Sequence, residues 1–294
     1  MQIDVVFSGG GIKGFALIGA YQAIEEKGYI IKRVAGTSAG AIISGFIAAG
    51  YKSEDIKVIM SEVELSNLFD PSFRFLPGPL RKWLSLYFQL GIYKGKKIEN
   101  WIEDKLDQKG IKTFADLPPQ ALRVVASDLT TGRLLVLPDD LIHYGIDPES
   151  FSVAKAIYMS SALPYFFQPV KMKSNGDTSV IIDGGVLSNF PLWLFDKDNI
   201  KKTRPVLGVK LSHRYEDMPK HEIDNGIDMF EALFETMKSA HDARYISRKH
   251  EKNIIFIPTD GVLTTEFQLT EQKKIALINQ GRKMANKFLM RWSH

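Results

Sequence analysis

Ser38 is the residue whose surroundings point most directly to chemistry. It lies in the segment GTSAG, where Gly36 and Gly40 flank it in the pattern G-x-S-x-G. On a sharp turn from a strand to a helix, small neighbours let the backbone close, the hydroxyl projects, and the helix N-terminus favours developing negative charge. Apolar residues 30–34 predict the strand, and small residues 39–49 predict the helix. This context favours a nucleophilic serine over a glycine-rich turn with an incidental one.

A run of glycines earlier in the chain could hold the charge that such a serine creates. The segment SGGGIKG at residues 8–14 joins an apolar stretch at residues 3–8 to the next expected helix. Consecutive glycines let neighbouring N–H groups point to one place, where they can stabilise the oxyanion of a tetrahedral intermediate. Gly9, Gly10 and Gly11 are therefore the candidate oxyanion donors, with Gly10 and Gly11 the best of the three.

The same loop also fits the dinucleotide-binding fingerprint. Gly9, Gly11 and Gly14 match G-x-G-x-x-G between a strand and a helix. In that fold the second strand ends in an acidic residue, whereas residues 33–36 read RVAG and lead into the serine turn. A dinucleotide-binding oxidoreductase is thus the weaker alternative, and a P-loop is excluded because no Gly-Lys-Ser/Thr closes the loop. Lys13 has two possible roles that the sequence leaves open. It is either a solvated residue of the first helical turn, or a residue that fixes the loop or attracts an anionic head group.

Two residues could accept the proton of Ser38. Asp183 ends a short β-branched run and precedes Gly184 and Gly185, whose missing side chains would let another segment approach. His213, one of six histidines, follows an expected strand and could complete a Ser–Asp–His triad. Asp-Gly is a frequent turn pair, and aspartate is a weak base with a reference pKa of about 3.9. The local sequence therefore leaves both partners open.

Composition removes several other classes of function. The 294 residues include no cysteine, which excludes disulfides, thiolate metal sites and a cysteine nucleophile. No residue spacing predicts a metal site, and we expect no cofactor. The net charge of +4 says little for nucleic acid, which usually needs clustered positive charge, but it suits weak attraction to an anionic membrane.

The N-terminal sequence bears on the compartment. It lacks a basic segment followed by an apolar stretch, so we see no signal peptide. The uncharged residues 34–51 just reach the length of a membrane span, but their glycines and hydroxyls favour a buried helix. We therefore expect a cytoplasmic protein with the option of peripheral membrane contact.

The elements that would position these residues follow the pattern of an α/β fold. Strand, glycine turn and helix occur twice in the first 49 residues, as in a parallel sheet covered on both faces. Further strands are expected at 122–127, 134–137, 179–182, 206–211 and 254–257, and long helices at 225–248 and 270–292. The sequence predicts a three-layer α/β/α sandwich with a mainly parallel central sheet, as a single domain over residues 1–294.

Residues 69–97 differ from the rest of the chain. They concentrate aromatic residues, interleave them with lysine and arginine, and contain three prolines in their first half. We interpret this segment as a cap-like insertion with short helices, outside the central sheet. Its rings could cover the site, pack in a subunit contact or dip into a membrane interface.

Three motifs together resemble those of the patatin-like phospholipases, in their bacterial form. They are the glycine loop at residues 9–14, GTSAG around Ser38, and Asp183 with its two glycines. The segment SALPYFF at residues 161–167 and FQLT at residues 267–270 are also similar to segments of that family. The resemblance covers nearly the whole chain.

The resemblance implies a calcium-independent lipid acyl hydrolase with a Ser–Asp dyad and no histidine. Carried over to this chain, Ser38 attacks the ester, Asp183 accepts the proton, and the loop at Gly10 and Gly11 holds the oxyanion. An acyl-enzyme forms on Ser38 and is released by water. The implied substrates are phospholipids, lysophospholipids or other acyl lipids.

Overall fold

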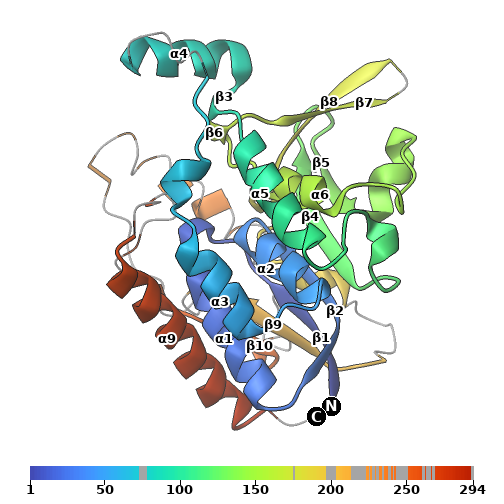
Figure 1. The fold of residues 1–294 in the computed structure, drawn as a ribbon, viewed down its shortest axis with the longest axis vertical. Coiled ribbons are helices and arrows are strands. Elements are labelled where there is room, and N and C mark those ends of the chain that lie inside the picture. The colour runs from blue at the N-terminus through green and yellow to red at the C-terminus, as the bar shows by residue number, and fades with distance from the viewer. Residues whose placement is uncertain are drawn as a thin grey trace.

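An eight-stranded sheet forms the centre of this computed structural model (Figure 1). The structure describes residues 1–72, 78–174, 176–196, 203–212, 251–259 and 269–292, with scattered positions between 223 and 242 and residues 262 and 266. The strands of the sheet are β1 (Gln2–Phe7), β2 (Ile30–Thr37), β4 (Leu122–Asp128), β5 (Arg133–Leu137), β7 (Val170–Ser174), β8 (Asp177–Asp183), β9 (Val206–Lys210) and β10 (Ile254–Phe256).

The sheet has a parallel part and an antiparallel part. Its order is β10-β9-β1-β2-β4-β8-β7, with β5 also paired to β4. The first five strands of this order run parallel, whereas β5 and β8 run antiparallel to β4, and β7 antiparallel to β8. The mixed α/β architecture with a mostly parallel central sheet is the one that the sequence predicts.

The direction of β8 decides where Asp183 lies. Thr37, at the end of β2, is paired with Val125, and the next residue of β4, Ala126, is paired with Asp183. Because β8 is antiparallel to β4, its C-terminal residue Asp183 lies level with the C-terminal residue of β2, Thr37, at the carboxyl edge of the parallel strands. We expected Asp183 at this edge, and an antiparallel strand brings it there.

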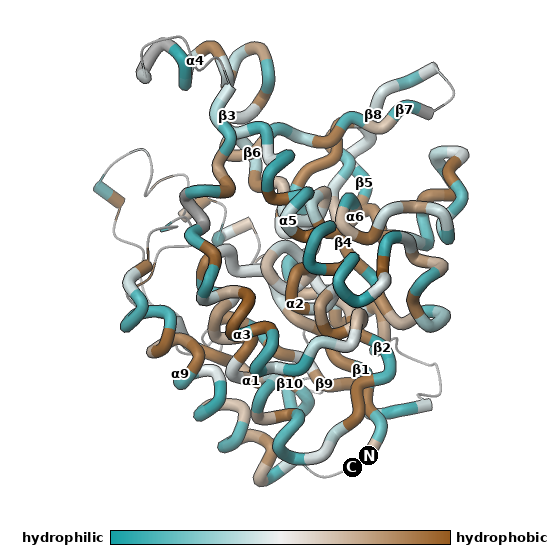
Figure 2. The backbone as a smooth tube through the Cα atoms, viewed as in Figure 1, coloured by the Kyte–Doolittle hydropathy of each residue, from teal (hydrophilic) through white to brown (hydrophobic). Residues whose placement is uncertain are grey.

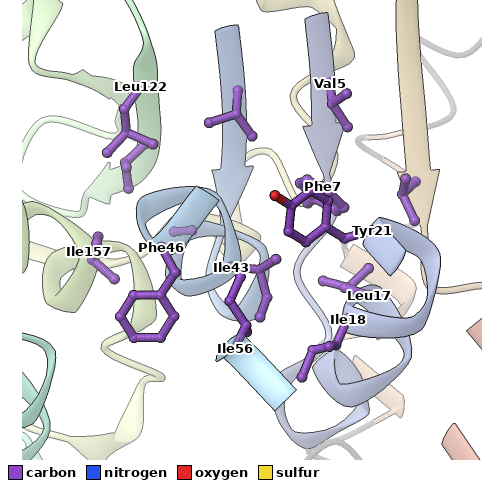
Figure 3. Packing of buried hydrophobic residues seen from close by; sticks show 14 of the residues in the cluster. Val5, Phe7, Leu17, Ile18, Tyr21, Ile43, Phe46, Ile56, Leu122 and Ile157 are labelled. Carbon is purple, nitrogen blue, oxygen red and sulfur yellow. The ribbon is translucent and has the colours of Figure 1, made fainter. Parts of the chain in front are cut away.

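In the described part of the chain, six α-helices besides the one at residues 78–89 accompany the sheet. They are α1 (Phe15–Glu26), α2 (Ala39–Ala48), α3 (Ser53–Glu62), α5 (Lys96–Asp107), α6 (Val153–Ser161) and α9 (Glu271–Leu289). Alternate residues of β1 divide the core between the two faces of the sheet. Val5 and Phe7 pack with Leu17 and Ile43 of the helices (Figure 3), whereas Val6 packs with Phe190 on the opposite face. Of the helix expected at 225–248, the structure describes only scattered positions.

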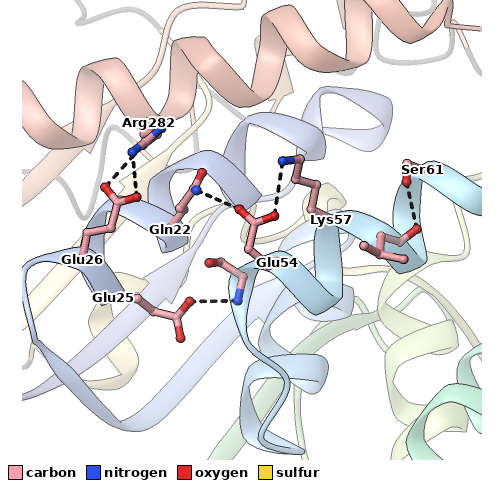
Figure 4. A network of polar contacts seen from close by, with 9 residues as sticks. Gln22, Glu25, Glu26, Glu54, Lys57, Ser61 and Arg282 are labelled. Atoms are coloured by element: carbon pink, nitrogen blue, oxygen red, sulfur yellow. Dashed lines mark hydrogen bonds and ion pairs between the residues drawn. The ribbon is translucent and has the colours of Figure 1, made fainter.

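Helices α1 and α9 approach each other closely, although they come from opposite ends of the chain (Figure 1). A Cβ atom at Gly19 would lie 1.8 Å from the carbonyl oxygen of Ile278, and one at Gly281 would lie 1.8 Å from that of Ala16. Polar contacts fix the outer side of this layer (Figure 4). Arg282 of α9 pairs with Glu26 of α1 at 2.8 Å.

The segment at residues 69–97 contains α4 (Gly78–Gln89) and β3 (Gly91–Tyr93). Strand β3 pairs in parallel with β6 (Tyr165–Phe167) in a separate two-stranded sheet. Helix α4 stands away from the body of the molecule, at the top of Figure 1. The segment thus holds a helix and a strand that lie outside the central sheet, and its role as a cap stays a prediction. Phe73, Phe75 and Leu76 lie outside the described residues.

The uncharged stretch at residues 34–51 forms the end of β2 and the largely buried α2. This is the buried helix that its glycines and hydroxyls indicate. Within the described ranges, no helix combines the length and the hydropathy needed to cross a bilayer.

Candidate active site

Ser38 occupies the sharp turn between β2 and α2. Its backbone angles are φ 54° and ψ −123°, a combination that residues other than glycine rarely adopt. Its glycine neighbours have no room for side chains. A Cβ atom at Gly36 would lie 2.3 Å from the carbonyl oxygen of Gly40, and one at Gly40 would lie 2.5 Å from that of Phe7. The G-x-S-x-G pattern is therefore a steric requirement of this turn.

The structure brings Ser38 and Asp183 into direct contact. The hydroxyl of Ser38 donates to Oδ2 of Asp183 at 2.6 Å. The other carboxylate oxygen accepts the N–H of Gly185 at 2.7 Å, and the side chain is only 2% exposed. Gly184 lets this turn pack against β4, because a Cβ atom there would lie 2.0 Å from the carbonyl oxygen of Val125. Both glycines after Asp183 thus have structural roles.

Two serines at the end of α6 support the turn at Ser38. Ser160 accepts the N–H of Ser38 at 2.9 Å and donates to the carbonyl oxygen of Val125 at 2.5 Å. The hydroxyl of Ser161 lies 3.3 Å from the carbonyl oxygen of Ser38. The sequence reasoning missed Ser160. Its only local signal is its place directly before the SALPYFF segment.

The glycine loop corrects one expectation. The N–H of Gly9 donates to the carbonyl oxygen of Asn189 at 2.9 Å, so Gly9 is engaged and is a poor candidate for an oxyanion donor. The N–H groups of Gly10 and Gly11 have no acceptor among the described residues. Gly11 has φ 54° and contributes to the same pocket as Ser38. These two glycines remain the candidate donors.

The other two residues of the loop motif have different settings. A Cβ atom at Gly14 would lie 2.8 Å from that of Ala39, so this glycine lets the loop pack against the start of α2. Lys13 is half-buried, and the described part of the chain gives it no acidic partner. Its role as a solvated or an anion-attracting residue stays a prediction.

An apolar cavity of about 110 Å³ opens beside Ser38 and Asp183. This volume is several times the roughly 10–15 Å³ that one water molecule needs. Helices α2, α3 and α5 contribute its walls together with residues near β3 and β6. The apolar lining includes Ile42, Ile43, Met60, Leu68, Phe69, Ile98, Trp101, Leu163 and Phe167. Among the described residues of the lining, the hydroxyls and the carboxylate come from Ser38, Ser161 and Asp183.

Tyr158 ties α6 to the rim of this cavity. Its hydroxyl lies 3.0 Å from the carbonyl oxygen of Lys94 and 2.9 Å from that of Gln168. Burial, followed by the nearby charges of Asp70 and Glu99, raises the pKa of Tyr158. The hydroxyl therefore stays a neutral donor, which holds the segments around β3 and β6 together.

The comparison with known families settles which architecture this is. Residues 5–196 match the model of the family described as patatin-like phospholipase. The chain belongs to the patatin-like phospholipase family.

Relatives of this patatin-like chain cover its whole length. The uncharacterized protein YqhO of Bacillus subtilis is 53% identical over 100% of both chains. The probable lipid hydrolase 463L of Invertebrate iridescent virus 6 is 22% identical over 96% of this chain and 87% of its own. The family thus includes lipid hydrolase homologues.

Two solved structures share the patatin-like fold. VipD of Legionella pneumophila has a TM-score of 0.59 and 20% identity, covering 98% of this chain and 67% of VipD. ExoU of Pseudomonas aeruginosa, in its complex with SpcU, has a TM-score of 0.53 and 19% identity, covering 99% of this chain and 51% of ExoU. At these identities the likeness concerns the fold alone.

The dinucleotide alternative does not fit the pocket of this patatin-like chain. The carboxylate of Asp183 lies in the same cavity as Gly11 and Gly14, where it would repel a pyrophosphate. Strand β2 ends in Gly36 and Thr37, so no acidic residue stands where the fingerprint places one for the ribose. His213 lies outside the described residues. Among those that are described, no three His, Asp or Glu side chains gather as metal ligands do.

Proposed function

We propose that this protein is a serine lipid acyl hydrolase that cleaves fatty-acyl esters of phospholipids or lysophospholipids. The observation that carries the proposal is the 2.6 Å hydrogen bond between Ser38 and Asp183 at an apolar cavity. A nucleophile needs a proton acceptor within hydrogen-bond reach, and Asp183 is that acceptor.

In the first half of the reaction, Oγ of Ser38 attacks the ester carbonyl carbon while its proton passes to Oδ2 of Asp183. The N–H groups of Gly10 and Gly11 stabilise the oxyanion that forms, an effect of about 3 kcal/mol for each donor. The intermediate then collapses. The bond to the alcohol breaks, the alcohol leaves with the proton from Asp183, and the acyl group stays on Ser38.

In the second half, water replaces the alcohol. Asp183 accepts a proton from the water as its oxygen attacks the acyl-enzyme, and the same donors hold the new oxyanion. Collapse releases the fatty acid and returns the proton to Ser38. The dyad is thus restored without any group beyond the chain and water.

Aspartate is a weak base, so the surroundings must assist it. The N–H of Gly185 holds Oδ1 of Asp183, which leaves Oδ2 directed at Ser38. Helix α2 begins at the residue after Ser38, and its positive N-terminal end favours negative charge on the serine oxygen. The helix end favours the alkoxide-like transition state over the resting hydroxyl, whereas the bond from Gly185 orients the carboxylate.

The cavity indicates the substrate class. The described lining is mostly aliphatic and aromatic, with Ser38, Ser161 and Asp183 at one side, and it suits a hydrocarbon chain whose ester end lies at Ser38. Burial of each methylene contributes about 0.8 kcal/mol, which rewards long acyl chains over acetyl esters. The apolar lining therefore supports acyl lipids as substrates.

The test is ester hydrolysis by single variants. We expect Ser38→Ala and Asp183→Asn each to lower kcat/KM at least about a thousandfold, because each removes one half of the nucleophile–base pair. Ser61→Ala, on the outer side of α3, and Asp177→Asn, at the exposed start of β8, serve as matched controls and should retain full activity. Circular dichroism and thermal unfolding show whether each variant keeps the fold.

Two outcomes would contradict the dyad. Activity that survives Ser38→Ala or Asp183→Asn in a folded protein excludes the assigned pair. Loss of activity in His213→Ala, equal to that in Asp183→Asn, indicates a triad instead. Labelling of Ser38 by a fluorophosphonate distinguishes an active hydrolase from a lipid-binding protein, and mass spectrometry of the products from a mixed lipid extract identifies the head group and acyl position.

A further inference from the structure

Helix α4 exposes three aromatic side chains. Its exposed positions carry Trp83, Tyr87 and Phe88, whose side chains are 60%, 67% and 64% exposed. Among its described side chains, Ser85 is fully buried, and Leu84 and Leu86 are half-buried. In a surface helix of a globular protein, apolar residues face the core and polar residues face water. The three exposed rings depart from this pattern and indicate that the outer face of α4 has an apolar partner.

The three rings form one continuous surface, which we call the α4 aromatic face. Trp83 and Tyr87 are stacked, with centroids 5.6 Å apart and planes 9° apart. Tyr87 meets Phe88 edge-on at 4.9 Å. Leu90, directly after the end of α4, is also exposed. Among the described elements, the main contact of α4 is with β3, so the face is uncovered.

The charges next to the α4 aromatic face have a single sign. Residues 78–97 contain five basic side chains and no acidic one, as the sequence GPLRKWLSLYFQLGIYKGKK shows. Lys82, Lys94, Lys96 and Lys97 are exposed. Figure 2 shows hydrophilic and hydrophobic residues side by side on α4 at the outer end of the molecule. Aromatic rings between lysines are typical of segments that lie in a membrane interface.

Helix α4 is connected to the cavity at Ser38 through a short path. Gln168, directly after β6, donates to Gln89 at the end of α4 and to Ser72 at 2.8 Å. Strand β3 follows α4 and pairs Tyr93 with Phe167, which lines the cavity. A partner that binds α4 would therefore lie close to the strands β3 and β6 at the rim of the cavity.

We propose that the α4 aromatic face docks on the surface of an anionic lipid bilayer. The rings enter the interface between head groups and acyl chains, while the surrounding lysines contact anionic head groups. A second copy of the chain fits less well. A two-fold interface through α4 would place the same cationic segment of both copies together, with no acidic residue in residues 78–97 to balance it.

The docking can be tested without any hydrolysis. The Ser38→Ala variant is mixed with vesicles of phosphatidylcholine, with or without phosphatidylglycerol, and the bound fraction is measured by sedimentation. Adding Trp83→Ser, Tyr87→Ser and Phe88→Ser should weaken binding to the anionic vesicles at least about tenfold, because burial of even one such ring accounts for this factor. Failure of the proposed dyad leaves this result unchanged.

A matched control and a second set of variants separate the two contributions. Met290→Ser removes an equally exposed apolar residue just after α9, whose C-terminal end lies far from α4 (Figure 1), and should not change binding. Lys82→Gln with Lys94→Gln should weaken binding to anionic vesicles at least about fivefold and leave binding to phosphatidylcholine alone unchanged. With Ser38 restored, the ring variants should hydrolyse a water-soluble short-chain ester normally, which shows that the site is intact.

Three results would overturn the proposal. The first is a Ser38→Ala protein that does not bind anionic vesicles. The second is a triple ring variant that binds them as tightly as its parent. The third is a dimer in solution that the ring substitutions convert to a monomer without any change in vesicle binding, since the face would then join two copies of the chain.

Discussion

Ser38 holds its backbone in a conformation that few non-glycine residues adopt. Angles of φ 54° and ψ −123° cost of the order of 1–3 kcal/mol for a residue with a Cβ atom. The surrounding structure maintains them through the hydrogen bond to Ser160 and through the packing of Gly36 and Gly40. The strain turns the hydroxyl toward Asp183, so the site is arranged at the expense of stability.

This strain makes a prediction about stability. Ser38→Gly should be more stable to urea than Ser38→Ala by about 1 kcal/mol, because glycine adopts these angles freely whereas alanine keeps the Cβ atom. The gain is smaller than the full strain, because glycine loses more backbone entropy on folding. Equilibrium unfolding of the two inactive variants measures the difference. Equal stabilities would show that Ser38 is not strained, and Ser61→Gly in α3 should be destabilising instead.

At the scale of residues, the sequence singled out the two candidate catalytic residues but not the residues that support them. Ser38 and Asp183 follow recognisable short motifs, and the structure places them together. Gly9 shares the motif of Gly10 and Gly11, but its N–H is engaged by Asn189, a contact across 180 residues of chain that no local pattern reveals. Ser160 was missed for the same reason, because its partners come from two other elements.

At the scale of elements, α1 and α9 pack through glycines. Gly19 and Gly281 let the two helices approach so closely that the backbone of one helix fills the space that a Cβ atom on the other would need. Such contacts contribute dispersion over a long helix pair and tolerate no added atom. Glycine within a helix otherwise costs about 1 kcal/mol relative to alanine. The two glycines are therefore kept for packing, against helix propensity.

Gly19→Ala should destabilise the protein by at least about 2 kcal/mol, because its Cβ atom would overlap the carbonyl oxygen of Ile278. Without that contact, the substitution would stabilise the protein, because alanine has the higher helix propensity. The sign of the change in the free energy of unfolding therefore shows whether the contact exists. Thermal and urea unfolding measure it. Gly78→Ala, where the added atom meets nothing within 4 Å, is the control and should stay within about 0.5 kcal/mol of the parent. A stabilised Gly19→Ala would refute the close packing.

The elements that the sequence predicted are those with strong patterns. Buried β-branched runs predicted β1, β2, β4, β8 and β9 within a few residues. The direction of β8 could not be predicted, since an isolated apolar run carries no sign of its neighbours. We did not predict α5 (Lys96–Asp107). Most of its residues are charged or polar, and it buries few apolar residues, such as Ile102 and Leu106, so its apolar periodicity is weak in the sequence.

At the scale of the whole molecule, the folded unit extends beyond the matched family segment. That match ends at residue 196, yet β9 lies between β1 and β10 in the sheet. The N–H of Leu211 donates to the hydroxyl of Ser8 at the start of the glycine loop, at 2.9 Å. Helix α9 covers α1, and Trp292 meets Tyr29 edge-on at 5.5 Å. The C-terminal third thus supports elements that carry the site.

A single cooperative unit is therefore expected for residues 1–294. Tryptophan fluorescence and far-UV circular dichroism should report one unfolding transition with the same midpoint. A fragment that ends at Asp196 should show no cooperative transition and no ester hydrolysis, because β1 loses its neighbour β9 and α1 exposes the apolar side that α9 covers. Removal of residues 293–294 alone is the control and should leave both properties unchanged. Two separate transitions, or a fragment as stable as the full chain, would contradict this expectation. The segment after Asp196 would then fold separately from the site, and the first 196 residues alone would position Gly10 and Ser38.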